Sequence, residues 1–169
     1  MMITPDYCRT MARYNQWQNR AVTDCVQAMP PAALEEDRGA FFGSILGTLN
    51  HLLWADLMWM ARLEGGSAPD VTSADSPEMT PNVREWARQR FVVDGRIREW
   101  ARKLDAVDLV GELAWQSGSM RVEMRRPIAL CVVHMFNHQT HHRGQVHAML
   151  TAAGRDPGVT DLAMMPDAG

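Results

Sequence analysis

The sequence contains few cysteines, and their spacing argues against two kinds of site. Among its 169 residues only Cys8, Cys25 and Cys131 are cysteines, and no Cys-x-x-Cys pair occurs. An odd number of widely spaced cysteines argues against a disulfide framework and against a thiolate zinc site. We therefore expect reduced thiols and a cytoplasmic protein. Cys131 lies about 10 Å from His138 along a helix axis, which is too far for both residues to bind one metal ion. We therefore interpret Cys131 as a core residue.

The sequence also lacks a run of positive charge and a long unbroken hydrophobic stretch. Its net charge is −3 and its pI is about 6.0, which gives nucleic-acid binding little electrostatic support. The longest apolar stretch, residues 45–63, is interrupted by Asn50, His51, Asp56 and Arg62. The first residues do not combine a basic segment with an apolar run. We expect no nucleic-acid binding, no membrane span and no signal peptide.

Start and stop signals divide the chain into four long helical segments. Proline or a capping residue precedes or opens most of them, and glycine or proline ends most of them. The predicted helices are residues 5–29, 42–63, 81–103 and 127–153. Residues 30–39 are predicted as a loop, and residues 65–80, rich in glycine, serine, proline and aspartate, as a long surface connection. The tail, residues 155–169, is predicted to be irregular and partly packed through Leu162, Met164 and Met165.

Residues 109–126 follow a different pattern. Val122 and Met124 alternate with charged residues after the turn signal Ser117-Gly118-Ser119, which predicts a short hairpin. No repeat or linker divides the chain, so we expect one domain spanning residues 1–169. The fold prediction is all-α: an up-and-down-type four-helix bundle, about 60% helical against the one-third that is usual, with the hairpin before the last helix.

Four of the six histidines fall between residues 134 and 142. Counting about 100° per residue from His134, the apolar stripe of this helix lies at roughly 100–160°. His138 at about 40° and His142 at about 80° flank that stripe. His134 itself, His141 at about −20° and His147 at about 220° lie farther away. A pair four residues apart can reach one metal ion, although two surface histidines would have the same spacing.

Only one histidine, His51, lies outside the C-terminal third of the chain. A lone histidine in an apolar helix is usually a core residue satisfied by a hydrogen bond. Combined with an inward-facing pair, however, it makes a three-histidine metal site with open positions for water or substrate. Imidazole ligands do not select one metal. We expect a divalent transition metal, zinc or nickel, with iron or manganese as alternatives.

Three motifs resemble those of the DinB family, bacterial metal-dependent four-helix-bundle proteins. They are Tyr-Asn-Gln-Trp-Gln-Asn at residues 14–19, Asn-His-Leu-Leu-Trp-Ala-Asp at residues 50–56, and Asn-His-Gln-Thr-His-His-Arg-Gly-Gln at residues 137–145. The last is the specific one. Together with Gly-Arg-Asp-Pro at residues 154–157 and Asp161-Leu162, the resemblance spans residues 4–163.

This resemblance implies a metal site and suggests a chemistry. In the family, one histidine of the second helix and two of the fourth hold the metal; the matching residues here are His51, His138 and His142. Relatives include transferases and isomerases that use mycothiol or bacillithiol, so a small thiol is an expected partner. Two functions stay open: an enzyme that activates a thiol or water for a small-molecule substrate, or a non-catalytic protein with a structural ion. The resemblance and six tryptophans also suggest a homodimer.

Several residues of these motifs admit more than one interpretation. Tyr14 and Trp17 are predicted as core aromatics, with a pocket wall near the metal as the alternative. Asp56 is expected to make a helix–helix or capping contact rather than to orient His51, because it lies about 140° around the helix. Gln139 falls within the apolar stripe and so requires a buried partner. By their residue types alone, Arg143 and Gly144 are predicted as a surface charge and a close-packing glycine.

Overall fold

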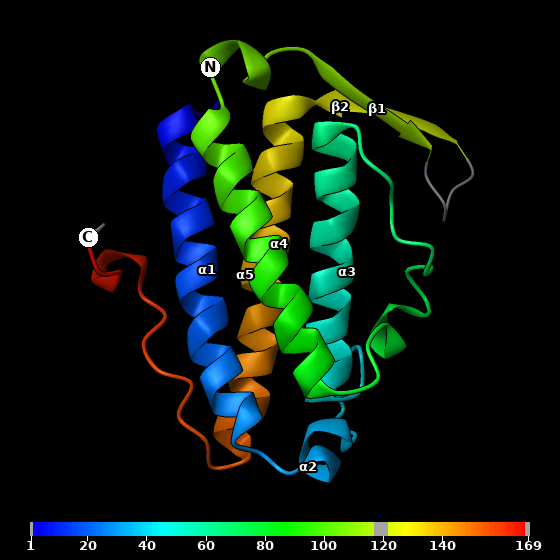
Figure 1. The fold of residues 1–169 in the computed structure, drawn as a ribbon, viewed down its shortest axis with the longest axis vertical. Helices are drawn as coiled ribbons and strands as arrows, with labels where there is room; N and C mark the ends of the chain where they lie inside the picture. The colour runs from blue at the N-terminus through cyan, green and yellow to red at the C-terminus, as the bar shows by residue number, and fades with distance from the viewer. Residues whose placement is uncertain (1, 117–121, 168–169) are drawn as a thin grey trace.

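A bundle of four long helices forms the body of the protein in the computed structural model, which describes residues 2–116 and 122–167 (Figure 1). The bundle helices are α1 (Pro5–Gln27), α3 (Ile45–Glu64), α4 (Val83–Lys103) and α5 (Ile128–Ala152). The shorter elements are α2 (Pro31–Glu35), the hairpin strands β1 (Glu112–Gln116) and β2 (Glu123–Pro127), and the 3₁₀ turns η1 (Ser76–Glu78), η2 (Ala106–Leu109) and η3 (Leu162–Met164). The predicted helical bundle with a hairpin before its last helix is confirmed.

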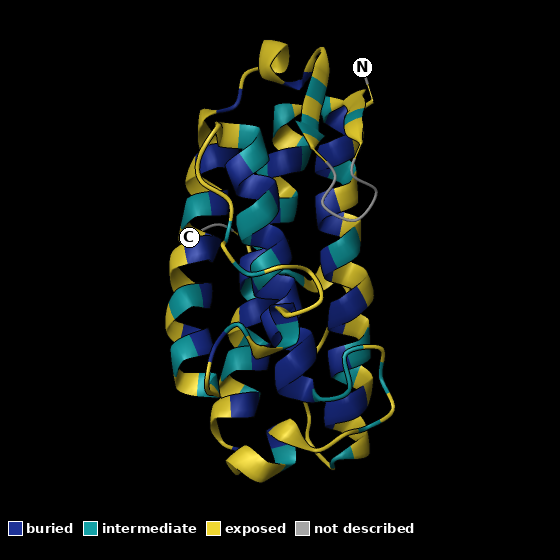
Figure 2. Ribbon diagram, turned by 90° about the vertical axis from the view of Figure 1, so that its right-hand side faces the viewer, coloured by how far each residue is buried: buried dark blue, intermediate teal, exposed yellow. Residues whose placement is uncertain are grey.

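Two of the neighbouring helix pairs in the bundle are parallel, so the up-and-down order predicted from the sequence is wrong. Figure 1 shows α3 and α4 running in one direction and α1 and α5 in the other. Two contacts confirm that α3 and α4 are parallel. The Trp86 indole near the start of α4 donates to the Leu49 carbonyl near the start of α3. Arg96, farther along α4, pairs with Glu64 at the end of α3. The connection between α3 and α4 must therefore return along the full length of the bundle. This crossover, residues 65–82, covers the outer side of α3 (Figures 1 and 2).

Capping side chains fix where α3 and α4 begin, and both begin later than the sequence pattern predicted. Ser44 accepts from the Gly47 amide, and Gly43 just before it has φ 71°. This left-handed residue separates Phe42 from the helix. Asn82 caps α4 through the Glu85 amide, because Thr80 is engaged elsewhere. Gly65, with φ 75°, ends α3 as predicted.

Three other regions refine the prediction. The segment expected to be a loop after α1 contains α2, because Pro31 occupies the first turn of a new helix. The strands of the hairpin pair in antiparallel register, with Trp115 opposite Met124, while the predicted turn at residues 117–119 lies outside the described residues. In the tail, Leu162 and Met164 are exposed, so their predicted packing is wrong, whereas Met165 is half-buried. Backbone carbonyls anchor the tail instead, as Tyr14 and Gln18 donate to those of Thr160 and Val159.

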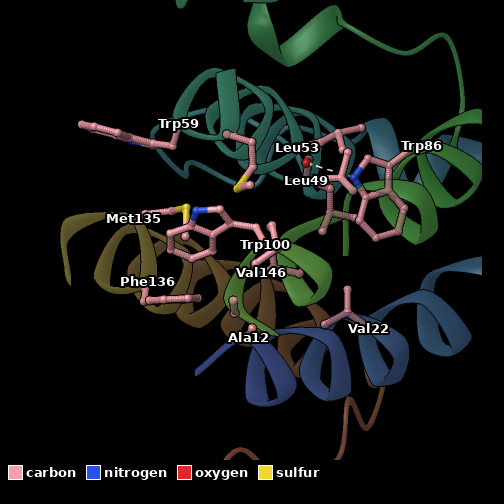
Figure 3. Packing of buried hydrophobic residues seen from close by; sticks show 14 of the residues in the cluster. Ala12, Val22, Leu49, Leu53, Trp59, Trp86, Trp100, Met135, Phe136 and Val146 are labelled. Atoms are coloured by element: carbon pink, nitrogen blue, oxygen red, sulfur yellow. Dashed lines mark hydrogen bonds between the residues drawn. The ribbon is translucent and has the colours of Figure 1, made fainter. Parts of the chain in front are cut away.

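The core consists of large apolar side chains from all four bundle helices. Figure 2 shows buried residues on the inward faces and exposed residues on the outer faces. The close view in Figure 3 shows Trp86 and Trp100 of α4 reaching between the helices toward residues such as Leu53 and Met135. Cys131 is also buried in this core, as predicted. Among the described residues, no helix has both the length and the apolarity needed to cross a membrane.

Charged side chains are also buried between the helices. Asp56 of α3 pairs with Arg90 of α4 at 2.7 Å, and Arg90 lies 2.9 Å from Asp94. Asn19 of α1 donates to Asp94. Each of these charged side chains is at most 5% exposed, so removing one partner would leave a buried charge uncompensated. Asp56 thus makes the expected helix–helix contact and does not orient His51.

Candidate metal centre

Three histidines converge between α3 and α5. One ring nitrogen from each of His51, His138 and His142 lies within 4.8 Å of the other two. The Nε2 atoms of His51 and His138 are 3.2 Å apart. Two side chains come from successive turns of α5, and the third comes from the antiparallel neighbour. These are the three residues that helix geometry and the family motif predicted together.

Ser76 holds the ring of His51. Its hydroxyl donates to the Ser73 carbonyl at 2.7 Å and lies 2.9 Å from His51 Nδ1. Because the hydroxyl hydrogen is already used, the oxygen accepts from Nδ1–H. That tautomer leaves the Nε2 lone pair directed at the other two histidines.

The crossover that carries Ser76 is attached to α3 by the neighbours of His51. Asn50 donates to the carbonyls of Pro77 and Thr80 and accepts from the Thr80 hydroxyl. The Trp54 indole donates to the Val71 carbonyl at 2.7 Å. The motif around His51 therefore contains a candidate ligand and also fixes the segment that orients it.

Gln145 plays the corresponding role for His142. Its side-chain oxygen lies 2.7 Å from His142 Nδ1 and accepts the Nδ1–H, which again leaves Nε2 for an ion. Gln145 is three residues along the same helix, so its position follows from helical spacing. Sequence reasoning assigned no role to Gln145 or Ser76. The spacing to His142 could have indicated Gln145, whereas no local pattern indicates Ser76.

Aromatic rings close one side of the centre. Phe42 stacks on the His51 ring at 3.8 Å between centroids and lies 5.3 Å from His142. Trp54 lies 5.7 Å from His51, near parallel to it. These rings exclude water from part of the site and limit the rotation of the His51 imidazole.

The environment keeps the three imidazoles uncharged. Burial, with a smaller effect from His142, lowers the pKa of His51 to about 4. Burial and the neighbouring histidines lower the pKa of His138 to about 3. Burial also lowers the pKa of His142, against the hydrogen bond to Gln145. Neutral imidazoles have free lone pairs at neutral pH, so the donor set fits a divalent transition metal.

The remaining described histidines are not members of this group. His134 lies against Trp59, with 5.1 Å between ring centroids, and His147 faces the Gly158 carbonyl. His141 is exposed beside His142. Within the described residues, no other histidine, cysteine or carboxylate completes a group with the three.

The other motif residues have structural contacts. Tyr14 is buried and holds the tail, and Trp17 is half-buried in a hollow formed partly by the tail. Arg143 is 5% exposed and donates to Asn15, so its predicted surface position is wrong. Its partners lie on α1, far away in sequence. Gly144 is exposed with open space around it, so close packing is also wrong. The Gln139 amide is buried, and the carboxylate of Asp56 is the polar group beside it.

The fold and the three converging histidines define a helical-bundle protein with a candidate histidine metal site. The sequence matches the DinB family over residues 2–168, and the chain belongs to that family. It is 24% identical over 163 residues to Protein DinB of Bacillus subtilis (strain 168), covering 94% of this chain and 93% of that protein. The crystal structure of a DinB-like protein from Bacillus cereus ATCC 10987 superposes with a TM-score of 0.64 at 15% identity. That match covers 85% of this chain and 91% of the other. At this identity the structural likeness establishes the fold.

Proposed function

We propose that this protein is a metal-dependent enzyme that activates a small thiol, or water, at a divalent ion held by His51, His138 and His142. The observation that carries the proposal is the number of ligands. Only three protein donors belong to the group among the described residues. Catalytic sites typically use three protein ligands and keep a position for substrate, whereas structural sites are closed by a fourth.

The chain's own residues prepare this site before any ion binds. Ser76 and Gln145 fix the tautomers of His51 and His142. Phe42 and Trp54 keep water from one side. When bound, a divalent ion held by neutral ligands keeps its positive charge and lowers the pKa of a thiol or water in the open position. A thiol is the preferred nucleophile because of the resemblance to thiol-dependent transferases, and water is the alternative.

Cobalt substitution tests the thiol proposal directly. We expect cysteine, a glutathione-like thiol or a sugar-linked thiol to produce an intense sulfur-to-metal charge-transfer band in the cobalt protein. The His138→Ala protein should show no such band, because it lacks a ligand. The His134→Ala protein should behave as wild type and serves as the matched control on the same helix.

The outcomes separate the alternatives. A band in wild type and in the His134→Ala protein, but not in the His138→Ala protein, supports thiol activation at this centre. If none of the three thiols changes the cobalt spectrum, thiol activation is refuted. A metal-dependent hydrolase or a structural ion that ties α3 to α5 would then be preferred.

A further inference from the structure

An open cleft lies beside the metal centre, between α3 and the crossover. Its volume is about 1110 Å³. Phe42 and Trp54 line one end, and both rings also contact the ring of His51. The cleft therefore shares a wall with the site at which chemistry is proposed. Its other lining residues include Met58, Arg62 and Trp115.

Met58 and Arg62 lie on the same face of α3 as His51. At about 100° per residue, Met58 and Arg62 lie within roughly 20° of His51 around the helix. The Arg62 guanidinium lies over the ring of Trp59, 4.7 Å from its centroid, and 5.0 Å from the centroid of Trp115. Trp59 is eight residues from His51, which corresponds to about 12 Å along the helix axis.

Arg62 is a cation held by aromatic rings and not by a carboxylate. None of the ion pairs among the described residues includes it. Asp70, the acidic residue that lines the same cleft, forms no such pair with it either. The side chain is half-buried, and burial lowers the pKa of its guanidinium. An anion delivered to this position would replace the lost hydration of the charge.

We propose that the cleft binds a substrate with an apolar body and a terminal anionic group, which is a carboxylate, sulfonate or phosphate. Arg62 binds the anionic group, and the reacting end of the substrate lies at the three histidines. The rings of Phe42, Trp54 and Trp115 contact the apolar body. The anion and the reacting group of the substrate are about 12 Å apart, as the spacing along α3 requires. This assignment of a substrate class rests on the proposed function of the metal centre, but the anion site itself does not require the ion.

The first test uses metal-free protein, so that it does not depend on metal chemistry. Binding of 4-phenylbutyrate and of 4-phenylbutan-1-ol is measured by calorimetry, because the two probes share one apolar body. We expect the wild-type protein to prefer the acid by about tenfold, the value of a partly exposed charge-assisted hydrogen bond. Arg62→Gln should abolish this preference, and Arg62→Lys should keep part of it, which also guards against a folding defect. Arg102→Gln, which alters an exposed arginine paired with Glu99, should keep the full preference.

The second test measures the spacing in the cobalt protein. The charge-transfer band should reach half its maximum at a lower concentration of 8-mercaptooctanoate than of 8-mercaptooctan-1-ol, and Arg62→Gln should remove that difference. The shorter 3-mercaptopropionate should gain nothing from Arg62, because it cannot span the cleft.

Equal affinity for acid and alcohol in the metal-free wild type, or a preference that survives in the Arg62→Gln protein, overturns the anion site. An Arg62-dependent preference without any cobalt band for thiols would leave the anion site intact and refute thiol activation. The two failures are thus distinguishable.

Discussion

Replacing Ser76 by alanine removes the atom that orients His51 and leaves the ligand itself in place. Ser76 is fully buried and His51 is 5% exposed, so water has little access to the Nδ1–H that would lose its acceptor at 2.9 Å. An unsatisfied buried donor costs about 1–3 kcal/mol, and loss of such an outer partner typically lowers metal affinity about 10–100-fold. We expect the Ser76→Ala protein to bind zinc in that range more weakly than wild type.

A competition titration against a chromophoric chelator measures the effect, with urea unfolding of the metal-free protein as a check on the fold. Ser73→Ala is the matched control. The Ser73 side chain is exposed, and only its backbone carbonyl contacts Ser76. Gln145→Ala should weaken binding less than Ser76→Ala, because Gln145 is half-buried and water can replace its oxygen. Unchanged zinc affinity in the Ser76→Ala protein, or an equal loss in the Ser73→Ala protein, would refute the reasoning.

Three further predictions concern the ligands, acid stability and association. Elemental analysis should find little metal after alanine substitution of any of the three ligands, His51, His138 or His142, and full occupancy after substitution of His134 or His147. A His138→Ala protein with full metal content would exclude the ligand assignment. Metal-free protein should lose stability as the pH falls below about 6.5, because histidines of the unfolded chain become protonated there. In the folded state the pKa is about 4 for His51 and about 3 for His138, so these two histidines stay neutral to lower pH. The urea concentration at the unfolding midpoint, measured from about pH 7.5 down to about pH 4.5, should fall more steeply in wild type than in the His138→Gln protein. An equal fall in both proteins would contradict this prediction. Light scattering should give twice the chain mass of 19.0 kDa, and a monomer mass at micromolar protein would remove the predicted homodimer.

Local signals predicted those parts of the molecule that depend on neighbours in sequence. Helical spacing placed His138 and His142 on the inward flank of α5, and Gly65 marked the end of α3. The start of α3 was missed because the apolar pair Phe41-Phe42 looks helical, whereas the Gly43-Ser44 cap is what fixes it.

Features that depend on partners distant in sequence could not be predicted in this way. Arg143 looks like a surface charge until Asn15 of another helix is placed beside it. Ser76 lies in a connection without periodicity, and its place beside His51 depends on the hydrogen bonds of Asn50 to the crossover. The family motifs include Asn15, Asn50 and Arg143, but Ser76 lies outside them.

The parallel course of α3 and α4 has a consequence for how such proteins can diversify. The returning crossover runs along the outside of the four helices, where it supplies one wall of the cleft and, through the buried Ser76, the hydroxyl beside His51. Surface connections tolerate sequence changes and insertions that helices in a core do not. Substitutions at Pro69, Val71 or Ala74 would therefore reshape the entrance to the candidate metal centre at little cost in stability, provided that Ser76 and the contacts of Asn50 persist. The shape of the cleft can in this way change while the three histidines stay in place.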